Sequence, residues 1–140
     1  MYRHTQIGWG IIIVLGLFIL FISLPIHNDK DILSANVILL LAIIMFSKLT
    51  ITIDKEYIRL VFGLIGFPHR KFKLAKIESC HTDKKRSFAI VLGIHYGFKE
   101  SLYNVSGPHA VVMVMKNGRK VYIGTDEPEK LREAIEERLA

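Results

Sequence analysis

Cys80, His81 and Asp83 are the residues of this sequence that come closest to a metal-binding cluster. Thiolate, imidazole and carboxylate groups are the usual protein ligands of zinc. Their segment is predicted to be a strand, however, so adjacent side chains point to opposite faces. Cys80 is the single cysteine, and the histidines are not spaced as ligand pairs. We therefore expect no metal site, no cofactor and no intramolecular disulfide.

Signatures of catalysis are also missing from the sequence. It contains no nucleophile elbow, no phosphate-binding glycine loop and no paired-carboxylate signature. We therefore predict that the protein is not an enzyme, and we identify no small-molecule substrate. Asn104-Val105-Ser106 matches a glycosylation sequon, which would be silent on the cytoplasmic side of a membrane.

Basic residues form a second group of candidates. Residues 48–120 contain 14 Lys and Arg against 5 Asp and Glu, a net charge of +9. Anionic lipid headgroups attract such residues by about 1 kcal/mol each. An ordinary solvated surface explains the same charge, and nucleic acid is not expected because no recognised binding motif accompanies it. The headgroup-facing candidates are Arg70, Lys71, Lys73, Lys76, Lys84, Lys85 and Arg86.

Two further segments combine apolar or aromatic side chains with glycines. In Gly63–Phe67, the side chains of Leu64, Ile65 and Phe67 either contact a membrane or partner, or cap the core. Between residues 88 and 103, a ligand groove is one interpretation, and structural aromatics with bulge glycines are the other. The candidate groove residues are His95, Tyr96, Phe98 and Tyr103.

The elements that must position these residues begin with an apolar N-terminal third. Residues 7–26 contain no charge, and residues 32–47 contain none either. An apolar helix of about 20 residues spans the roughly 30 Å hydrocarbon layer of a bilayer. We therefore predict a transmembrane hairpin in residues 1–48, with helices at about 7–26 and 32–48. A cleaved signal peptide and a pair of buried core helices are the alternatives.

The basic residues near these helices predict an orientation. Arg3 precedes the first helix, whereas Lys48, Lys55 and Arg59 follow the second. Such residues are enriched on the cytoplasmic side. The expected location is the plasma membrane, crossed more than once, with both termini and the remaining domain cytoplasmic.

Residues 49–140 show the patterns of a β domain. Leu49–Ile53 alternates apolar and polar residues with period 2, as strands do, and Tyr57–Phe62 is predicted as the returning strand. Asn117-Gly118 predicts a hairpin with a type I′ turn. Residues 127–139 predict a helix that is charged except for one apolar stripe, formed by Leu131, Ala134, Ile135 and Leu139. Further strands are expected at 71–74, 77–83, 101–105, 109–115 and 120–123. The predicted fold class is α+β, with a helical hairpin followed by an antiparallel barrel or sandwich and a C-terminal capping helix.

This order of elements resembles the bacterial membrane-anchored pleckstrin-homology-like proteins. The resemblance rests on Leu102–Gly107, on Ile123–Leu131 with its helix entry, and on Gly93–Tyr96. His95 stands where the pattern favours arginine, which puts a basic role at this position in doubt. The resemblance covers about residues 45–140 and implies a PH-like barrel more strongly than any activity.

These observations lead to a hypothesis of function. We expect a non-catalytic, membrane-anchored interaction or scaffolding module. Its partners would be the lipid bilayer and either another protein or a second copy of the chain. An anionic headgroup sensor and an accessory subunit of a transport or secretion complex are the alternatives.

Overall fold

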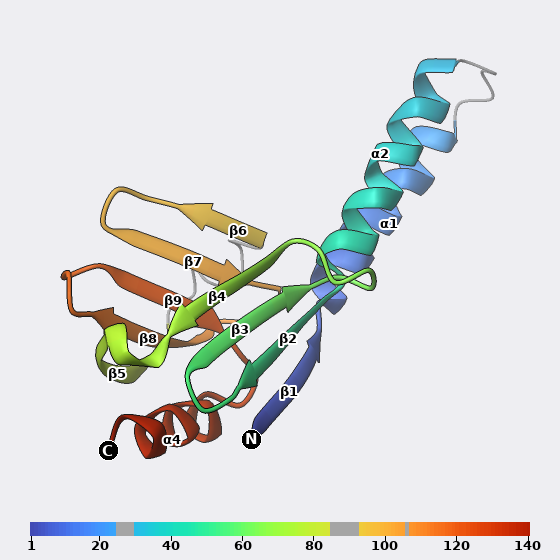
Figure 1. The fold of residues 1–140 in the computed structure, drawn as a ribbon. Helices are drawn as coiled ribbons and strands as arrows, with labels where there is room; N and C mark the ends of the chain where they lie inside the picture. The colour runs from blue at the N-terminus through green and yellow to red at the C-terminus, as the bar shows by residue number, and fades with distance from the viewer. Residues whose placement is uncertain (25–29, 85–92, 106) are drawn as a thin grey trace.

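The computed structural model describes residues 1–24, 30–84, 93–105 and 107–140 (Figure 1). Its elements form two β-sheets, a helical hairpin that projects from them, and a C-terminal helix (Figure 1). In chain order they are β1 (Tyr2–Ile7), α1 (Trp9–Ser23), α2 (Lys30–Phe46), β2 (Lys48–Ile53), β3 (Tyr57–Phe62), β4 (His69–Lys73), the short 3₁₀ helix η1 (Leu74–Lys76), β5 (Ile77–Lys84), β6 (Gly93–Tyr96), β7 (Glu100–Asn104), β8 (His109–Met115), β9 (Lys120–Gly124) and α4 (Pro128–Leu139).

The first sheet has the order β1-β2-β3-β4, and all its pairs are antiparallel. In β2 and β3 every second side chain is fully buried, and Ile51 lies opposite Leu60 in the register. This alternation is what a pleated strand with one buried face requires. The first sheet therefore contributes its apolar face to the core.

The second sheet has the order β5-β8-β9-β7-β6. Its pairs are antiparallel except β7 with β9, which is parallel. Val111 and Met113 of β8 and Ile123 of β9 join the same core as β2 and β3. Helix α4 packs against β5, β8 and η1, and it buries Leu131 and Ile135 in this core (Figure 1).

The helical hairpin lies between two strands that pair with each other, β1 and β2. Close backbone contact fixes its base: the Gly8 N–H donates to the Ser47 carbonyl at 2.7 Å. A Cβ on Gly8 would lie 2.9 Å from the Val105 carbonyl oxygen, so a larger residue would clash. From this base α1 and α2 run side by side away from both sheets (Figure 1).

The predicted transmembrane helices are wrong. Helix α1 has 15 residues and α2 has 17, because Ile7 belongs to β1 and Lys48 to β2. No helix within the described ranges combines the length and apolar character needed to cross a membrane. The expected multi-pass plasma-membrane location is corrected on the same finding.

The predicted all-antiparallel barrel is also wrong for the part of the chain that is described, since β7 and β9 are parallel and the strands form two sheets without a closed barrel. After β4 the chain turns through η1, and β5 pairs with β8 instead of β4. The result is two sheets with separate edge strands. The strand predicted at 57–62, the strand at 109–115 and a C-terminal helix are confirmed.

The hairpin of β8 and β9 is confirmed, but its turn type is not. Gly118 has φ of +83°, and no other residue type has positive φ among those described. A type I′ turn would require positive φ at Asn117 as well. The Gly118 N–H donates to the Met115 carbonyl at 2.8 Å, and the Met115 N–H donates to the Arg119 carbonyl at 2.8 Å. This pattern is a longer loop with glycine in the left-handed position.

Candidate functional site

The outward faces of α1 and α2 are the largest exposed apolar surface of the described chain. Each helix packs against the other, and only Ile11 is buried among their residues. Leu20 is 63% exposed, although its side chain is fully apolar. The other large apolar side chains exposed on the two helices are Trp9, Ile13, Val14, Leu17, Phe18, Phe21, Leu33, Val37, Ile38, Leu40 and Leu41.

The loop between β3 and β4 extends this apolar surface at the base of the hairpin. The Leu64 N–H donates to the Ile44 carbonyl in α2 at 3.0 Å. Gly63 has φ of +72°, and a Cβ there would lie 2.6 Å from two carbonyl oxygens of α2, so only glycine allows this approach. We call the four exposed side chains at this base the apolar collar; its members are Trp9, Leu64, Ile65 and Phe67.

The predicted membrane or partner loop thus lies beside the hairpin instead of capping the core. Leu64, Ile65 and Phe67 are all more than half exposed. Their loop is short and tied at both ends, since the Phe62 N–H donates to the Pro68 carbonyl at 2.9 Å. The loop therefore keeps three apolar side chains exposed beside the base of the hairpin.

The basic candidates do not converge on one surface. Lys71 and Lys73 share one face of β4, and the Lys71 ammonium lies 3.9 Å from the centre of the Tyr57 ring. The side chain of Arg70 lies on the opposite face of the same strand. Lys76 ends η1 and Lys84 ends β5. The last two members, Lys85 and Arg86, lie outside the described residues.

Arg70 instead links the two sheets. Its Nε donates to the Tyr96 hydroxyl at 3.0 Å, and its guanidinium lies 5.2 Å from the centre of that ring. This hydrogen bond is the largest cause of the raised pKa of Arg70. Tyr103 is buried beneath, with ring centres 5.8 Å from Phe72 and 6.1 Å from Tyr96. Arg70 is thus exposed but fixed against Tyr96 of the second sheet.

The candidate groove at these aromatics is small. A cavity of about 210 Å³ is lined by Arg70, Tyr96, Tyr103 and Arg119 among others. His95 is exposed on β6 and does not line it, and Phe98, at 98% exposure, lies away from it in the turn between β6 and β7. Tyr103 thus belongs mainly to the core, and the four candidates do not form one continuous groove.

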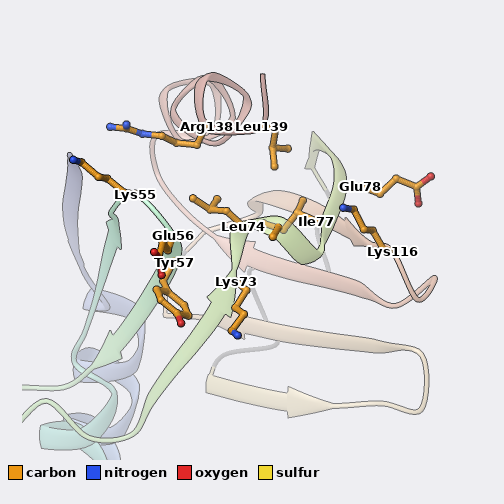
Figure 2. A pocket seen from close by; sticks show the side chains of 11 residues that line it. Lys55, Glu56, Tyr57, Lys73, Leu74, Ile77, Glu78, Lys116, Arg138 and Leu139 are labelled. Atoms are coloured by element: carbon orange, nitrogen blue, oxygen red, sulfur yellow. The ribbon is translucent and has the colours of Figure 1, made fainter.

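A larger groove lies at the end of the first sheet away from the hairpin (Figure 2). Its volume is about 690 Å³, and we call it the basic groove. Four cationic side chains line it, from the β2–β3 turn, β4, the β8–β9 turn and α4: Lys55, Lys73, Lys116 and Arg138. Four apolar side chains also line it: Leu74, Ala75, Ile77 and Leu139.

Glu56 and Glu78 are the acidic residues of the basic groove. Neither makes a salt bridge to a described residue, and the four cations make none within the same part of the chain. The groove therefore carries a net charge of +2 with its cations available. Sequence reasoning had selected only Lys73, because the others come from turns and a helix end far apart in the chain.

The Cys80 segment shows no metal-binding geometry. The Cys80 thiol donates to the Arg132 carbonyl of α4 at 3.8 Å, and burial raises its pKa. Within the described ranges no three His, Cys, Asp or Glu residues lie close enough together to hold a metal ion. Cys80 accordingly packs as part of the contact between β5 and α4.

Comparison with known proteins adds no assignment. No protein family matches the chain, and no curated protein matches it either. The resemblance to bacterial pleckstrin-homology-like proteins therefore stays a prediction.

Proposed function

We propose that this protein is a non-catalytic binding module that attaches to a lipid bilayer by inserting its α1–α2 hairpin. The observation that carries the proposal is the apolar surface on both outward faces of the hairpin. Soluble monomers rarely expose apolar patches of this extent. We call the two β-sheets with α4 the body of the molecule. The body already buries its own core without using these exposed side chains.

Lipid is the cover that suits this surface best. The helices pack face to face, so their outward faces point in different directions. A second copy or a flat partner surface would cover one of these faces and leave the other in water. Acyl chains surround an apolar helix pair on all sides. We therefore favour lipid over self-association for the hairpin.

The apolar collar supports the same orientation. An indole ring prefers the boundary between lipid and water, and Trp9 lies 61% exposed where α1 begins. The loop carrying Leu64, Ile65 and Phe67 meets the same end of the hairpin. The collar would therefore rest in the polar boundary layer and hold the body against it.

The proposal is insertion, and it does not include crossing. Helices of 15 and 17 residues are about 22 and 26 Å long, less than the roughly 30 Å of the hydrocarbon layer. Lys30 and Asp31, at the start of α2, carry opposite charges at the far end of the hairpin. Attachment would depend on apolar contact, so the protein should bind neutral lipid. An anionic headgroup sensor would instead require acidic lipid.

Trp9 allows a direct test, because it is the only tryptophan. The full-length chain would be mixed with neutral phosphatidylcholine vesicles and its tryptophan emission recorded. We expect a blue shift, and stronger quenching by lipids brominated near the headgroup than by lipids brominated near the chain end. An unchanged spectrum in a folded sample would contradict the proposal.

Two double variants distinguish insertion of the hairpin from non-specific binding to vesicles. Leu17→Ser with Leu20→Ser removes two outward side chains of the hairpin, and should lower vesicle partitioning by about tenfold or more. The control, Lys99→Ser with Lys120→Ser, changes two exposed residues, one in the β6–β7 turn and one at the start of β9, and should bind as the parent does. Equal partitioning of both variants would contradict the proposal that the hairpin is the inserting element. Dimerisation without vesicle binding would replace lipid by a second copy.

A further inference from the structure

The basic groove lies at the opposite end of the first sheet from the apolar collar. The collar loop joins β3 to β4 at one end, whereas Lys55 and Glu56 join β2 to β3 at the other. Strands of six residues separate these ends by about 20 Å. A bilayer that holds the hairpin and collar would therefore not reach the groove.

The shape and lining of the groove restrict its ligand. Figure 2 shows Lys55 and Arg138 on one side, Lys116 on the other, and Leu74 with Ile77 between them. Compact phosphate ligands are bound by donors that converge on one point, and a carboxylate such as Glu56 or Glu78 would repel them. Here the cations are distributed along the groove with an apolar surface between them.

We infer that the basic groove binds an acidic peptide segment of a partner protein, with carboxylates on its rim and an apolar side chain on its floor. Leu74 and Ile77 are almost fully buried and fix the base of the groove, whereas the accessible apolar surface comes from Ala75, which is exposed, and Leu139, which is half-buried. Lys73 and Lys116 are exposed beside it, with no ion pair to any described residue. Glu56 and Glu78 would disfavour a uniformly acidic ligand and so select for spaced charges.

The inference is independent of lipid attachment and can be tested without vesicles. The full-length chain in mild detergent would be titrated into a fluorescein-labelled octapeptide of alternating glutamate and leucine, with fluorescence anisotropy as the readout. We expect saturable binding. Lys73→Glu with Lys116→Glu should weaken it by about tenfold, because two weak attractions become repulsions.

The matched control changes net charge equally outside the groove. Lys99→Glu with Lys120→Glu alters two exposed lysines that do not line it, and should leave the affinity within about twofold of the parent. Circular dichroism would verify that both variants are folded. Equal weakening by the two variants would overturn the assignment of the groove, as would the absence of peptide binding.

Two further ligands test which chemical groups the basic groove recognises. Replacing leucine by serine in the peptide should weaken binding, because the apolar floor loses its contact. Unchanged affinity of the serine peptide would overturn the apolar part of the inference. Inorganic tripolyphosphate should bind more weakly than the leucine peptide; tighter binding would overturn the peptide assignment in favour of a phosphate ligand.

Discussion

The hairpin and the two-sheet body use the same apolar residues in opposite ways. Leu60 in β3 is completely buried, whereas Leu20 in α1 is 63% exposed. The body folds by removing its apolar side chains from water, which is the dominant favourable term in folding. The hairpin leaves most of its large apolar side chains exposed. Burial in the core therefore does not explain its composition, and this is why we propose that it contacts lipid.

The largest difference between the two regions should appear on truncating these leucines. Leu60→Ala should lower the free energy of unfolding by about 2–5 kcal/mol, because it leaves a cavity between the sheets. Leu20→Ala should change it by no more than about 0.5 kcal/mol. Urea unfolding of the full-length chain in mild detergent, followed by circular dichroism, measures both. Similar losses would mean that the hairpin is part of the cooperative core.

Glycine substitutions extend the comparison with a smaller effect. A Cβ on Gly124 in β9 would overlap the Asn104 side chain, so Gly124→Ala should cost about 1–3 kcal/mol. Gly16 in α1 has open space around its Cβ position, and Gly16→Ala should stabilise by up to about 1 kcal/mol through helix propensity. Unfolding midpoints of the two variants should therefore move in opposite directions. Movement in one direction would show that the two sites are not in contrasting environments.

Tyr2 tests whether β1 belongs to the body although it leads directly into the hairpin. Burial, followed by the charges of Glu127 and Asp126, raises its pKa to about 12. Since the folded pKa exceeds the ordinary value of 10.0, its contribution to stability is complete below pH 10 and is lost as pH rises through 12. Tyr2→Phe should lose less stability than the parent over this window.

Unfolding midpoints at about pH 9 and pH 11 would show this difference, with tyrosine absorbance as an independent readout of ionisation. Tyr96→Phe, on β6 in the second sheet, is the comparison variant. Parallel pH profiles for the parent and Tyr2→Phe would place Tyr2 in water and detach β1 from the body.

The strands of the body were predictable where burial follows a local pattern. β2 alternates apolar and polar residues, and α4 carries its buried Leu131 and Ile135 at helical spacing. β1 gave no such signal, because its inward positions hold polar side chains. Gln6 is buried there and donates from Nε2 to the Gly124 carbonyl at 2.5 Å. A polar contact made across 118 residues has no local signature.

Longer-range features limited the prediction of both the hairpin and the groove. The ends of α1 and α2 depend on the pairing of β1 with β2, which takes Ile7 and Lys48 out of the helices. The parallel pairing of β7 with β9 likewise depends on the whole fold. Lys116 and Arg138 reach one groove only after the sheets and α4 have packed. Sequence spacing alone could not bring them together.

The smallest effect is expected at Asp54, in the β2–β3 turn at the end of the first sheet away from the hairpin. Its carboxylate accepts the backbone N–H groups of Glu56 at 3.1 Å and Tyr57 at 2.9 Å, and pairs with Arg59 at 2.7 Å. These contacts, the backbone ones first, lower the pKa of Asp54 below its ordinary value of 3.8. The stabilisation is therefore present above about pH 4 and is lost as pH falls through the lowered pKa.

Asp54→Asn should be slightly less stable than the parent at neutral pH, and the difference should shrink on acidification. Glu56→Gln is the control, since it removes a charge from the same turn without removing these hydrogen bonds to the Asp54 carboxylate. Urea midpoints at about pH 7 and pH 3 would measure both. A constant difference across this range would show that ionisation of Asp54 does not contribute to the stability of the turn. The body would then depend on burial at this end, in still sharper contrast with the exposed hairpin.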